Sequence, residues 1–250
     1  MCRMVLLWGD FENVFEPFFR SLSDVAENDS LARNDNEPLS HKDGWGILNI
    51  SKERIKLERY GNPLTLRVDP PDTRKGVAII HARAAAKGEG MGILNAHPFH
   101  LQDETYDVYI THNGWFDKYK INELLKLGSV KNMNDSEVFL KLVMTQKGPI
   151  ENRVRTALKL SRKNGYMKGG ANVYVVSIKR GTNKVSIIYH TDTSQEKTYG
   201  EYNKLYLMKG RTWTGVTSSS LRLSRYFPKK IEIEELRRGK IYTAKMELSN

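Results

Sequence analysis

The sequence predicts an α+β fold in which two antiparallel or mixed sheets carry helices on their outer faces. Strand-like segments, interrupted by one helical pattern, extend to Thr111, three helical patterns follow, and a second series of strand-like segments begins after Gly169 and Gly170. Hydrophobic residues make up 39% of the chain and charged residues 28%, as in ordinary globular proteins. This composition excludes intrinsic disorder, collagen-like repeats and coiled coil as the main architecture.

The first half begins with a predicted strand over residues 2–8. A helix is predicted over 14–25, because apolar residues recur there at helical spacing, at Val14, Phe15, Phe18, Phe19 and Leu22. Short strands are expected between Pro, Gly and Asn residues, at 44–49, 55–59, 76–82 and 106–111. The Gly-rich stretch 87–105 has little regular pattern and is predicted to be an ordered functional loop.

The second half begins with three predicted helices, at 121–127, 136–146 and 150–163. The first ends before Gly128, and Asn134 with Glu137 resembles a capping box that opens the second. The rest of the chain predicts strands at 172–179, 185–191, 204–209, 212–218 and 240–246, with the segment RGTNK as a hairpin turn between the first two.

The chain carries a formal net charge of +11, from 40 Lys and Arg against 29 Asp and Glu, which raises the question of nucleic acid. The basic residues are scattered, usually with acids nearby, and the densest cluster, 159–168, lies partly on a predicted helix. A solvated basic surface is the simplest interpretation, so nucleic acid is not expected as a partner. Such a positive field would still raise the encounter rate with anionic substrates.

The length of 250 residues suits one large domain or two small ones, and we expect a single domain over 2–250. No segment approaches 18 consecutive apolar residues, and Asp10, Glu12 and Glu16 interrupt the stretch where a signal peptide would be apolar. We therefore expect a soluble, cytoplasmic protein without membrane contact.

Four of the six histidines lie close together in the sequence, at His81, His97, His100 and His112. Their spacing matches no common zinc motif, and no second cysteine is present, so no metal is expected. Three alternating glycines, Gly88, Gly90 and Gly92, match neither a dinucleotide-binding nor a phosphate-binding loop. No cofactor is expected.

The only cysteine, Cys2, directly follows the initiator Met. A single thiol excludes an internal disulfide. Methionine is normally removed before a side chain as small as that of cysteine, so Cys2 is a candidate mature N-terminus. The alternative is a small buried hydrophobic residue at the start of a strand. Position alone leaves both interpretations open.

Five segments, taken in order, resemble a known family: MCR at the start, HKDGWGI (41–47), IHARAAAKG (80–88), NAHPF (95–99) with THNGWF (111–116), and NDSE (134–137). They resemble the class II glutamine amidotransferase domain, a member of the N-terminal nucleophile hydrolases, and within it the standalone proteins that begin MCR. The match spans about 2–140 closely, and continues through the strand-rich remainder, 170–250, only as strand pattern and the segment TSSSL (217–221).

The resemblance implies a four-layer αββα sandwich of two antiparallel sheets, with Cys2 at the end of a central strand. It also implies that Cys2 is the nucleophile, with its own α-amine as base, and forms a thioester with the substrate's acyl group. The Asn113 side-chain amide and the Gly114 backbone N–H would stabilise the oxyanion. Asn113 and Gly114 alone would also suit a type I′ hairpin turn, which is compatible with that role.

The same resemblance assigns the two charged ends of glutamine to Arg83, for the α-carboxylate, and Asp135, for the α-ammonium. Arg83 could instead be a strand-end surface residue, and Asp135 could also stabilise a helix N-terminus. His97 and Phe99 would shape the pocket wall, whereas His81 and Trp45 are expected to be buried structural residues. Lys87 departs from the family, since many glutamine-using members carry His or a small polar residue there.

The expected function is hydrolysis of the side-chain amide of glutamine, or of a γ-glutamyl compound, with release of ammonia or an amine. Because 250 residues leave no room for a synthase domain beside the sandwich, ammonia delivery would require a separate synthase subunit. One alternative is a γ-glutamyl peptide or metabolite amidase without ammonia transfer. Another is a basic nucleic-acid-binding or partner-activating protein with an inactive hydrolase fold.

Overall fold

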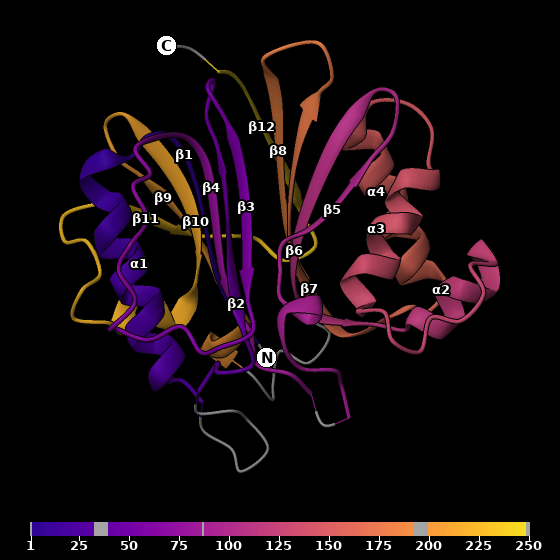
Figure 1. The fold of residues 1–250 in the computed structure, drawn as a ribbon, viewed down its shortest axis with the longest axis horizontal. Coiled ribbons are helices and arrows are strands. Elements are labelled where there is room, and N and C mark those ends of the chain that lie inside the picture. Colours follow the sequence, from indigo (N-terminus) through magenta and orange to yellow (C-terminus); the bar gives the residue numbers. More distant parts are fainter. Residues whose placement is uncertain (1, 33–39, 87, 193–199, 249–250) are drawn as a thin grey trace. The chain divides into compact units, whose positions relative to one another are not determined.

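The computed structural model describes residues 2–32, 40–86, 88–192 and 200–248. The chain divides into two compact units, Met1–Pro98 with Glu196–Arg237, and Phe99–Gln195 with Arg238–Asn250. Each unit contains one sheet with helices on one of its faces (Figure 1). Neighbouring strands are antiparallel throughout both sheets of the described residues. The predicted α+β class with two antiparallel sheets is confirmed.

The sheet of the first unit has the strand order β11-β9-β10-β1-β4-β2-β3. Its strands are β1 (Arg3–Asp10), β2 (Trp45–Ile50), β3 (Ile55–Tyr60), β4 (Lys75–Ala82), β9 (Leu205–Lys209), β10 (Trp213–Ser218) and β11 (Glu232–Glu235). Strand β1 lies between β4 and β10, with Arg3 opposite Ala82 and Val5 opposite Thr217. Cys2 therefore stands immediately before a central strand, as predicted.

Helix α1 (Glu12–Glu27) covers one face of this sheet (Figure 1). Phe15, Phe18, Phe19 and Leu22 recur at helical spacing and are all buried. The Phe19 ring meets the edge of Trp45 from β2 at a centroid distance of 5.9 Å. This aromatic core fixes the helix on the sheet that carries Cys2. A short 3₁₀ helix, η2 (Gly200–Asn203), precedes β9, and another, η3 (Ser219–Leu223), follows β10.

The sheet of the second unit has the order β12-β8-β7-β6-β5. Its strands are β5 (Phe99–Gln102), β6 (Tyr106–Phe116), β7 (Met167–Lys179), β8 (Lys184–Asp192) and β12 (Ile241–Glu247), and its helices are α2 (Lys118–Leu125), α3 (Asp135–Thr145) and α4 (Ile150–Lys163). Helix α3 contacts β5 and β6, and α4 contacts β7 and β8. Their apolar faces close one core, in which the rings of Phe116 and Phe139 stack at 4.0 Å.

Most predicted elements agree with the structure, and α4 has the predicted bounds. The prediction of an irregular loop at 87–105 is corrected, because this stretch contains the 3₁₀ helix η1 (Ile93–Asn95) and strand β5. Strand β5 is too short to show a periodic pattern and forms through its pairing with β6. Strand β11 was also not predicted, and β7 begins before Gly169 and Gly170.

None of the helices among the described residues is long and apolar enough to span a membrane.

Candidate active site

Cys2 immediately precedes β1 and is 9% exposed. Its Sγ is 3.7 Å from the backbone oxygen of Ala84, to which the thiol donates. Burial raises the pKa of the Cys2 thiol, although the Ala84 contact and the charge of Arg83 act in the opposite direction. The protonated thiol is thus favoured near neutral pH, and a nucleophilic role would need a base to take the proton.

Arg83 directly follows β4, and its backbone is tied to the segment HKDGWGI. The Arg83 N–H donates to the Gly44 oxygen at 2.9 Å, and the Asp43 N–H donates to the Arg83 oxygen at 3.0 Å. The Asp43 carboxylate accepts from the Ala85 N–H at 2.8 Å. These bonds hold two of the motifs that carry the resemblance side by side, next to the Cys2 thiol.

The guanidinium of Arg83 is buried, and the residue is only 1% exposed. Its Nη2 donates to Glu89 at 3.0 Å, and Nη1 is buried with no hydrogen-bond partner among the residues that the structure describes. A buried cationic donor left without an acceptor is unfavourable, and a ligand carboxylate would satisfy it. The alternative of a strand-end surface arginine does not fit this burial. Glu89 was not anticipated from the sequence.

His97 also belongs to the first unit and is 3% exposed. Its ring lies against that of His81, with centroids 4.2 Å apart. The His97 backbone oxygen approaches Gly46 so closely that a Cβ there would lie 2.1 Å from it. His81 and Trp45 are buried in β4 and β2, as predicted. The role of His97 in a pocket wall stays a prediction.

Asn113 and Gly114 lie in the second unit, inside strand β6. Asn113 is 3% exposed and pairs with Asn172 of β7, and the register of the two strands shifts between Gly114 and Phe116. The hairpin turn that the sequence allowed is therefore wrong. Gly114 has φ +151° and a Cβ there would lie 2.2 Å from the Gly170 oxygen, so the backbone at this irregularity requires glycine.

Asp135 is the first residue of α3, and its carboxylate accepts hydrogen bonds at 2.8 Å from the backbone N–H groups of Phe116 and Ser136. Asn134 caps the helix, since its side chain accepts from the Ser136 N–H at 3.0 Å. Asp135 thus joins the irregular end of β6 to the N-terminus of α3, a structural role that the sequence had left open. Binding of a substrate ammonium by Asp135 stays a prediction.

Phe99, the first residue of β5, is 4% exposed and belongs to the core of the second unit. Its predicted place in a pocket wall is not tested by this packing. Within the first unit the structure brings Cys2 and Arg83 together, and within the second it connects Asp135 to the end of the strand that carries Gly114. Lys87 lies outside the described residues.

A buried polar network around Asp29 is hydrogen-bonded to the backbone of Cys2. Asp29 accepts from Arg3 Nε at 2.6 Å, from His41 Nε2 at 3.0 Å and from Ser220 Oγ at 3.0 Å, all on one carboxylate oxygen. Arg3 Nη1 in turn donates to the Cys2 backbone oxygen at 3.3 Å. Although burial opposes it, bonding to His41 and the charge of Arg3 lower the pKa of Asp29 to about 2. This network fixes the backbone from which the thiol projects.

The sequence analysis assigned no role to these residues. Arg3, His41 and Ser220 belong to the quoted segments MCR, HKDGWGI and TSSSL, so the family resemblance offered a signal for them. Asp29 offered none, because it is one of several acids in an otherwise unpatterned stretch, residues 24–37. Among the described residues, no group of three or more His, Cys, Asp or Glu side chains could hold a metal ion.

No protein-family model matches the chain, and no curated protein matches it. Solved structures do. One is described as the allosteric regulatory enzyme of purine biosynthesis, with TM-score 0.66, 16% identity, and coverage of 99% of this chain and 49% of the other. Another is glutamine phosphoribosylpyrophosphate amidotransferase from B. subtilis, complexed with ADP and GMP, with TM-score 0.62, 13% identity, and coverage of 99% and 49%. The chain spans about half the length of each.

These likenesses show the fold. The chain shares the fold of these two structures, as the sequence resemblance to the glutamine amidotransferase domain predicted.

Proposed function

We propose that this protein is an N-terminal cysteine amidohydrolase of the glutamine amidotransferase type. It would cleave the side-chain amide of glutamine, or of a γ-glutamyl compound, through a thioester on Cys2. The observation that carries the proposal is the buried Arg83 guanidinium, whose charge acts on the Cys2 thiol and whose Nη1 lacks an acceptor among the described residues. A free α-carboxylate of the substrate would supply that acceptor.

In the proposed reaction, the Cys2 α-amine, freed by removal of Met1, takes the thiol proton as sulfur attacks the amide carbon. The carbonyl electrons move to oxygen, and the resulting oxyanion is assigned to the Asn113 side-chain amide and the Gly114 N–H. Loss of one such donor typically lowers the rate by about 10²–10³-fold. The ammonium formed at Cys2 then returns the proton to the leaving nitrogen, and ammonia or an amine departs. Water hydrolyses the thioester and regenerates the thiol.

The raised pKa of the Cys2 thiol supports this use of a built-in base. An α-amine has an ordinary pKa of about 7.7–8.0, so a useful fraction is unprotonated near neutral pH. Two finer assignments belong to the proposal, namely Asp135 for the substrate α-ammonium, and His97 with Phe99 for the pocket wall. A separate synthase subunit would be needed only if the ammonia is transferred, whereas a γ-glutamyl peptide or metabolite amidase needs none.

The nucleophile is tested by intact mass and by labelling with a glutamine analogue that carries an electrophilic ketone at the side-chain carbonyl. We expect native protein to lack Met1 and to carry one label on Cys2, and Cys2→Ala to be neither labelled nor active. Label on another residue, or turnover by Cys2→Ala, would refute the assignment. Turnover of glutamine, asparagine and several γ-glutamyl peptides, followed as ammonia or amine release, separates glutaminase from γ-glutamyl amidase activity.

The role of Arg83 is tested by Arg83→Ala. Because a hydrogen bond to a charged group contributes about 1.5–3 kcal/mol, losing the carboxylate contact should raise KM for glutamine by roughly 10–100-fold. Arg74→Ala is a matched control, since Arg74 belongs to the same unit but its side chain is 63% exposed. An unchanged KM in Arg83→Ala would mean that the substrate carboxylate binds elsewhere or is absent.

A further inference from the structure

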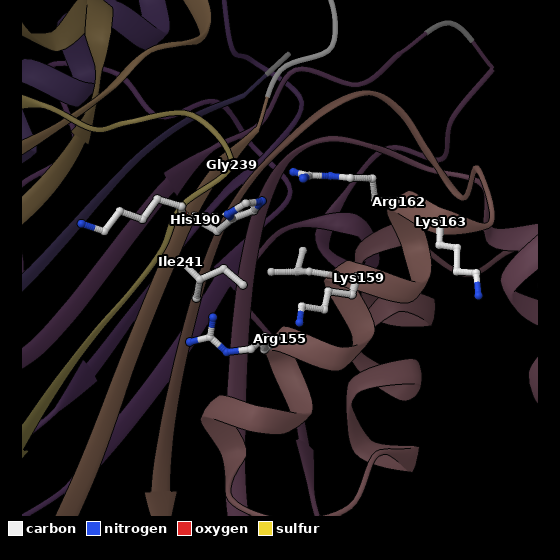
Figure 2. A pocket seen from close by; sticks show the side chains of 9 residues that line it. Arg155, Lys159, Arg162, Lys163, His190, Gly239 and Ile241 are labelled. Atoms are coloured by element: carbon white, nitrogen blue, oxygen red, sulfur yellow. Dashed lines mark hydrogen bonds between the residues drawn. The ribbon is translucent and has the colours of Figure 1, made fainter.

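The second unit contains a cavity of about 520 Å³ that none of the predicted catalytic or substrate-binding residues lines. It lies between helix α4 and the adjoining strands β8 and β12 (Figure 2). Ligand cavities typically occupy about 300–1,000 Å³, so this one is large enough for a small organic molecule. The lining residues are Arg155, Leu158, Lys159, Arg162, Lys163, His190, Gly239, Lys240 and Ile241.

The lining is strongly cationic. Arg155, Lys159, Arg162 and Lys163 follow one another along α4 at the spacing that places side chains on one helix face, and Lys240 adds a fifth cation next to β12. No Asp or Glu occurs among these described lining residues. Like charges at i and i+4 repel on a helix, so an anion bound between Arg155 and Lys159, or between Lys159 and Lys163, would offset that repulsion.

Three of these cations are available to a ligand. Arg155, Lys159 and Lys163 form no ion pair with any residue that the structure describes, and all three are exposed. Arg162, in contrast, is held in place, because its guanidinium pairs with Asp192, which also pairs with Arg238. In Figure 2 its side chain reaches toward Gly239, where an added Cβ would lie 3.7 Å from Arg162 Nη2.

The floor of the cavity combines apolar surface with one buried polar atom. Leu158 is 4% exposed, and Ile241 lies opposite His190 in the β8–β12 pair. His190 is 2% exposed, and its Nδ1 donates to the Lys240 backbone oxygen at 2.9 Å. Nε2 is buried and has no hydrogen-bond partner in the described part of the chain. In Figure 2 the ring stands among the lining side chains and faces α4.

A phosphate group can form a hydrogen bond with His190 Nε2 whether the imidazole ring is neutral or protonated. With the Nδ1 proton donated to a carbonyl, a neutral ring presents an Nε2 lone pair that accepts from a P–OH group. A protonated ring would instead donate to a phosphoryl oxygen. Because the second pKa of a phosphate monoester is about 6, most of it is the dianion at neutral pH, and the smaller monoanionic fraction keeps the one P–OH group. A sulfate ester has no such proton to donate.

We propose that this cavity binds an organic phosphate monoester. The phosphate lies among the α4 cations and contacts His190 Nε2, and the organic body packs on Leu158 and Ile241. The requirement for both a phosphate and an apolar body follows from the two kinds of lining surface.

The test is isothermal titration of the full chain with 1-naphthyl phosphate, compared with inorganic phosphate, 1-naphthyl sulfate and 1-naphthol. We expect 1-naphthyl phosphate to bind at least about tenfold more tightly than each of the other three. Equal binding of inorganic phosphate would overturn the apolar contact, and equal binding of the sulfate ester would overturn the contact with His190. No measurable binding of 1-naphthyl phosphate would overturn the whole proposal.

Variants locate the site. Arg155→Gln and Lys159→Gln change exposed helix residues, so folding should be preserved, and each should weaken 1-naphthyl phosphate binding by about tenfold. Lys184→Gln is the matched control, because it removes one exposed cation from β8 outside the cavity and should leave binding unchanged. Equal losses in all three variants would indicate attraction by net charge alone. Binding of duplex RNA with a steep salt dependence, without binding of 1-naphthyl phosphate, would overturn the proposal and indicate a nucleic-acid surface instead.

Discussion

Loss of Asp29 should strongly disturb the first unit. This residue is fully buried, three donors share its Oδ2, and the Leu31 N–H donates to its other oxygen at 3.1 Å. Asp29→Asn keeps the shape of the side chain but removes the charge that balances Arg3. If the Asn side-chain nitrogen took the place of Oδ2, it would also face the three donors that now bond to Oδ2, and a donor cannot accept from them. We therefore expect Asp29→Asn to be strongly destabilising.

The size of the effect follows from two arguments. Removing one partner of a buried ion pair typically costs about 3–5 kcal/mol, because the other charge stays buried without compensation. The lowering of the Asp29 pKa from 3.8 to about 2 gives a smaller figure, about 2.5 kcal/mol, for the preference of the site for the ionised carboxylate. We take the larger range for the variant, since the reversed amide dipole adds to the loss of charge. For a chain of this length it corresponds to a decrease in Tm of roughly 6–20 °C.

The assay is thermal and urea unfolding followed by circular dichroism at pH 7. Asp72→Asn is the matched control, because the Asp72 side chain is 71% exposed and pairs with an exposed arginine. Exposed ion pairs contribute about 0–1 kcal/mol, so this control should differ little from the parent. A loss below about 1 kcal/mol in Asp29→Asn would mean that the network does not hold Arg3 as described.

Two further predictions concern the same unit. Burial lowers the pKa of His41 from 6.5 to about 4, although the hydrogen bond to Asp29 acts in the opposite direction. As the pH falls, the unfolded chain therefore binds a proton at this residue before the folded chain does, and the free energy of unfolding decreases by roughly 3 kcal/mol between about pH 6.5 and pH 4. Urea midpoints of the parent at pH 7, 5 and 4 should show this decrease, and His41→Gln should lack it. Gly46→Ala should destabilise by about 1–3 kcal/mol, because its Cβ would meet two backbone oxygens, His97 O at 2.1 Å and Glu58 O at 2.7 Å. Gly181→Ala, whose Cβ would meet nothing within 4 Å although its φ is +72°, should cost less in the same urea assay.

Periodicity in the sequence predicted the long elements well, because their packing faces repeat at the spacing of the element itself. Helix α4 shows this most clearly, with Ile150, Val154, Ala157 and Leu158 all buried. Strands β5 and β11 have four residues each and no such repeat, and their residues become strands through their partners. Local pattern cannot supply that pairing.

In the candidate site, too, some features could be predicted from the sequence and others depend on distant parts of the chain. The resemblance pointed to Cys2 and Arg83, and the Cys2 thiol contacts the backbone of Ala84, the residue after Arg83. Neither the burial of Arg83 nor its contact with Glu89 could be predicted. The strand position of Gly114 depends on the approach of Gly170, more than fifty residues later in the chain, and the same two letters, Asn-Gly, would otherwise favour a turn. A short motif such as Asn-Gly thus does not determine its own backbone conformation.

The network around Asp29 allows positioning and chemistry to be distinguished by experiment. Arg3 connects Asp29 to the backbone oxygen of Cys2, whereas Arg83 has its unsatisfied donor available to a ligand. In the fraction of Asp29→Asn that stays folded, the Cys2 backbone loses its fixed donor while Arg83 is unchanged. If the proposed function holds, kcat should decrease with KM for glutamine little altered, the reverse of the pattern expected for Arg83→Ala. A rise in KM alone in Asp29→Asn would mean that the network shapes the carboxylate site and does not position the nucleophile.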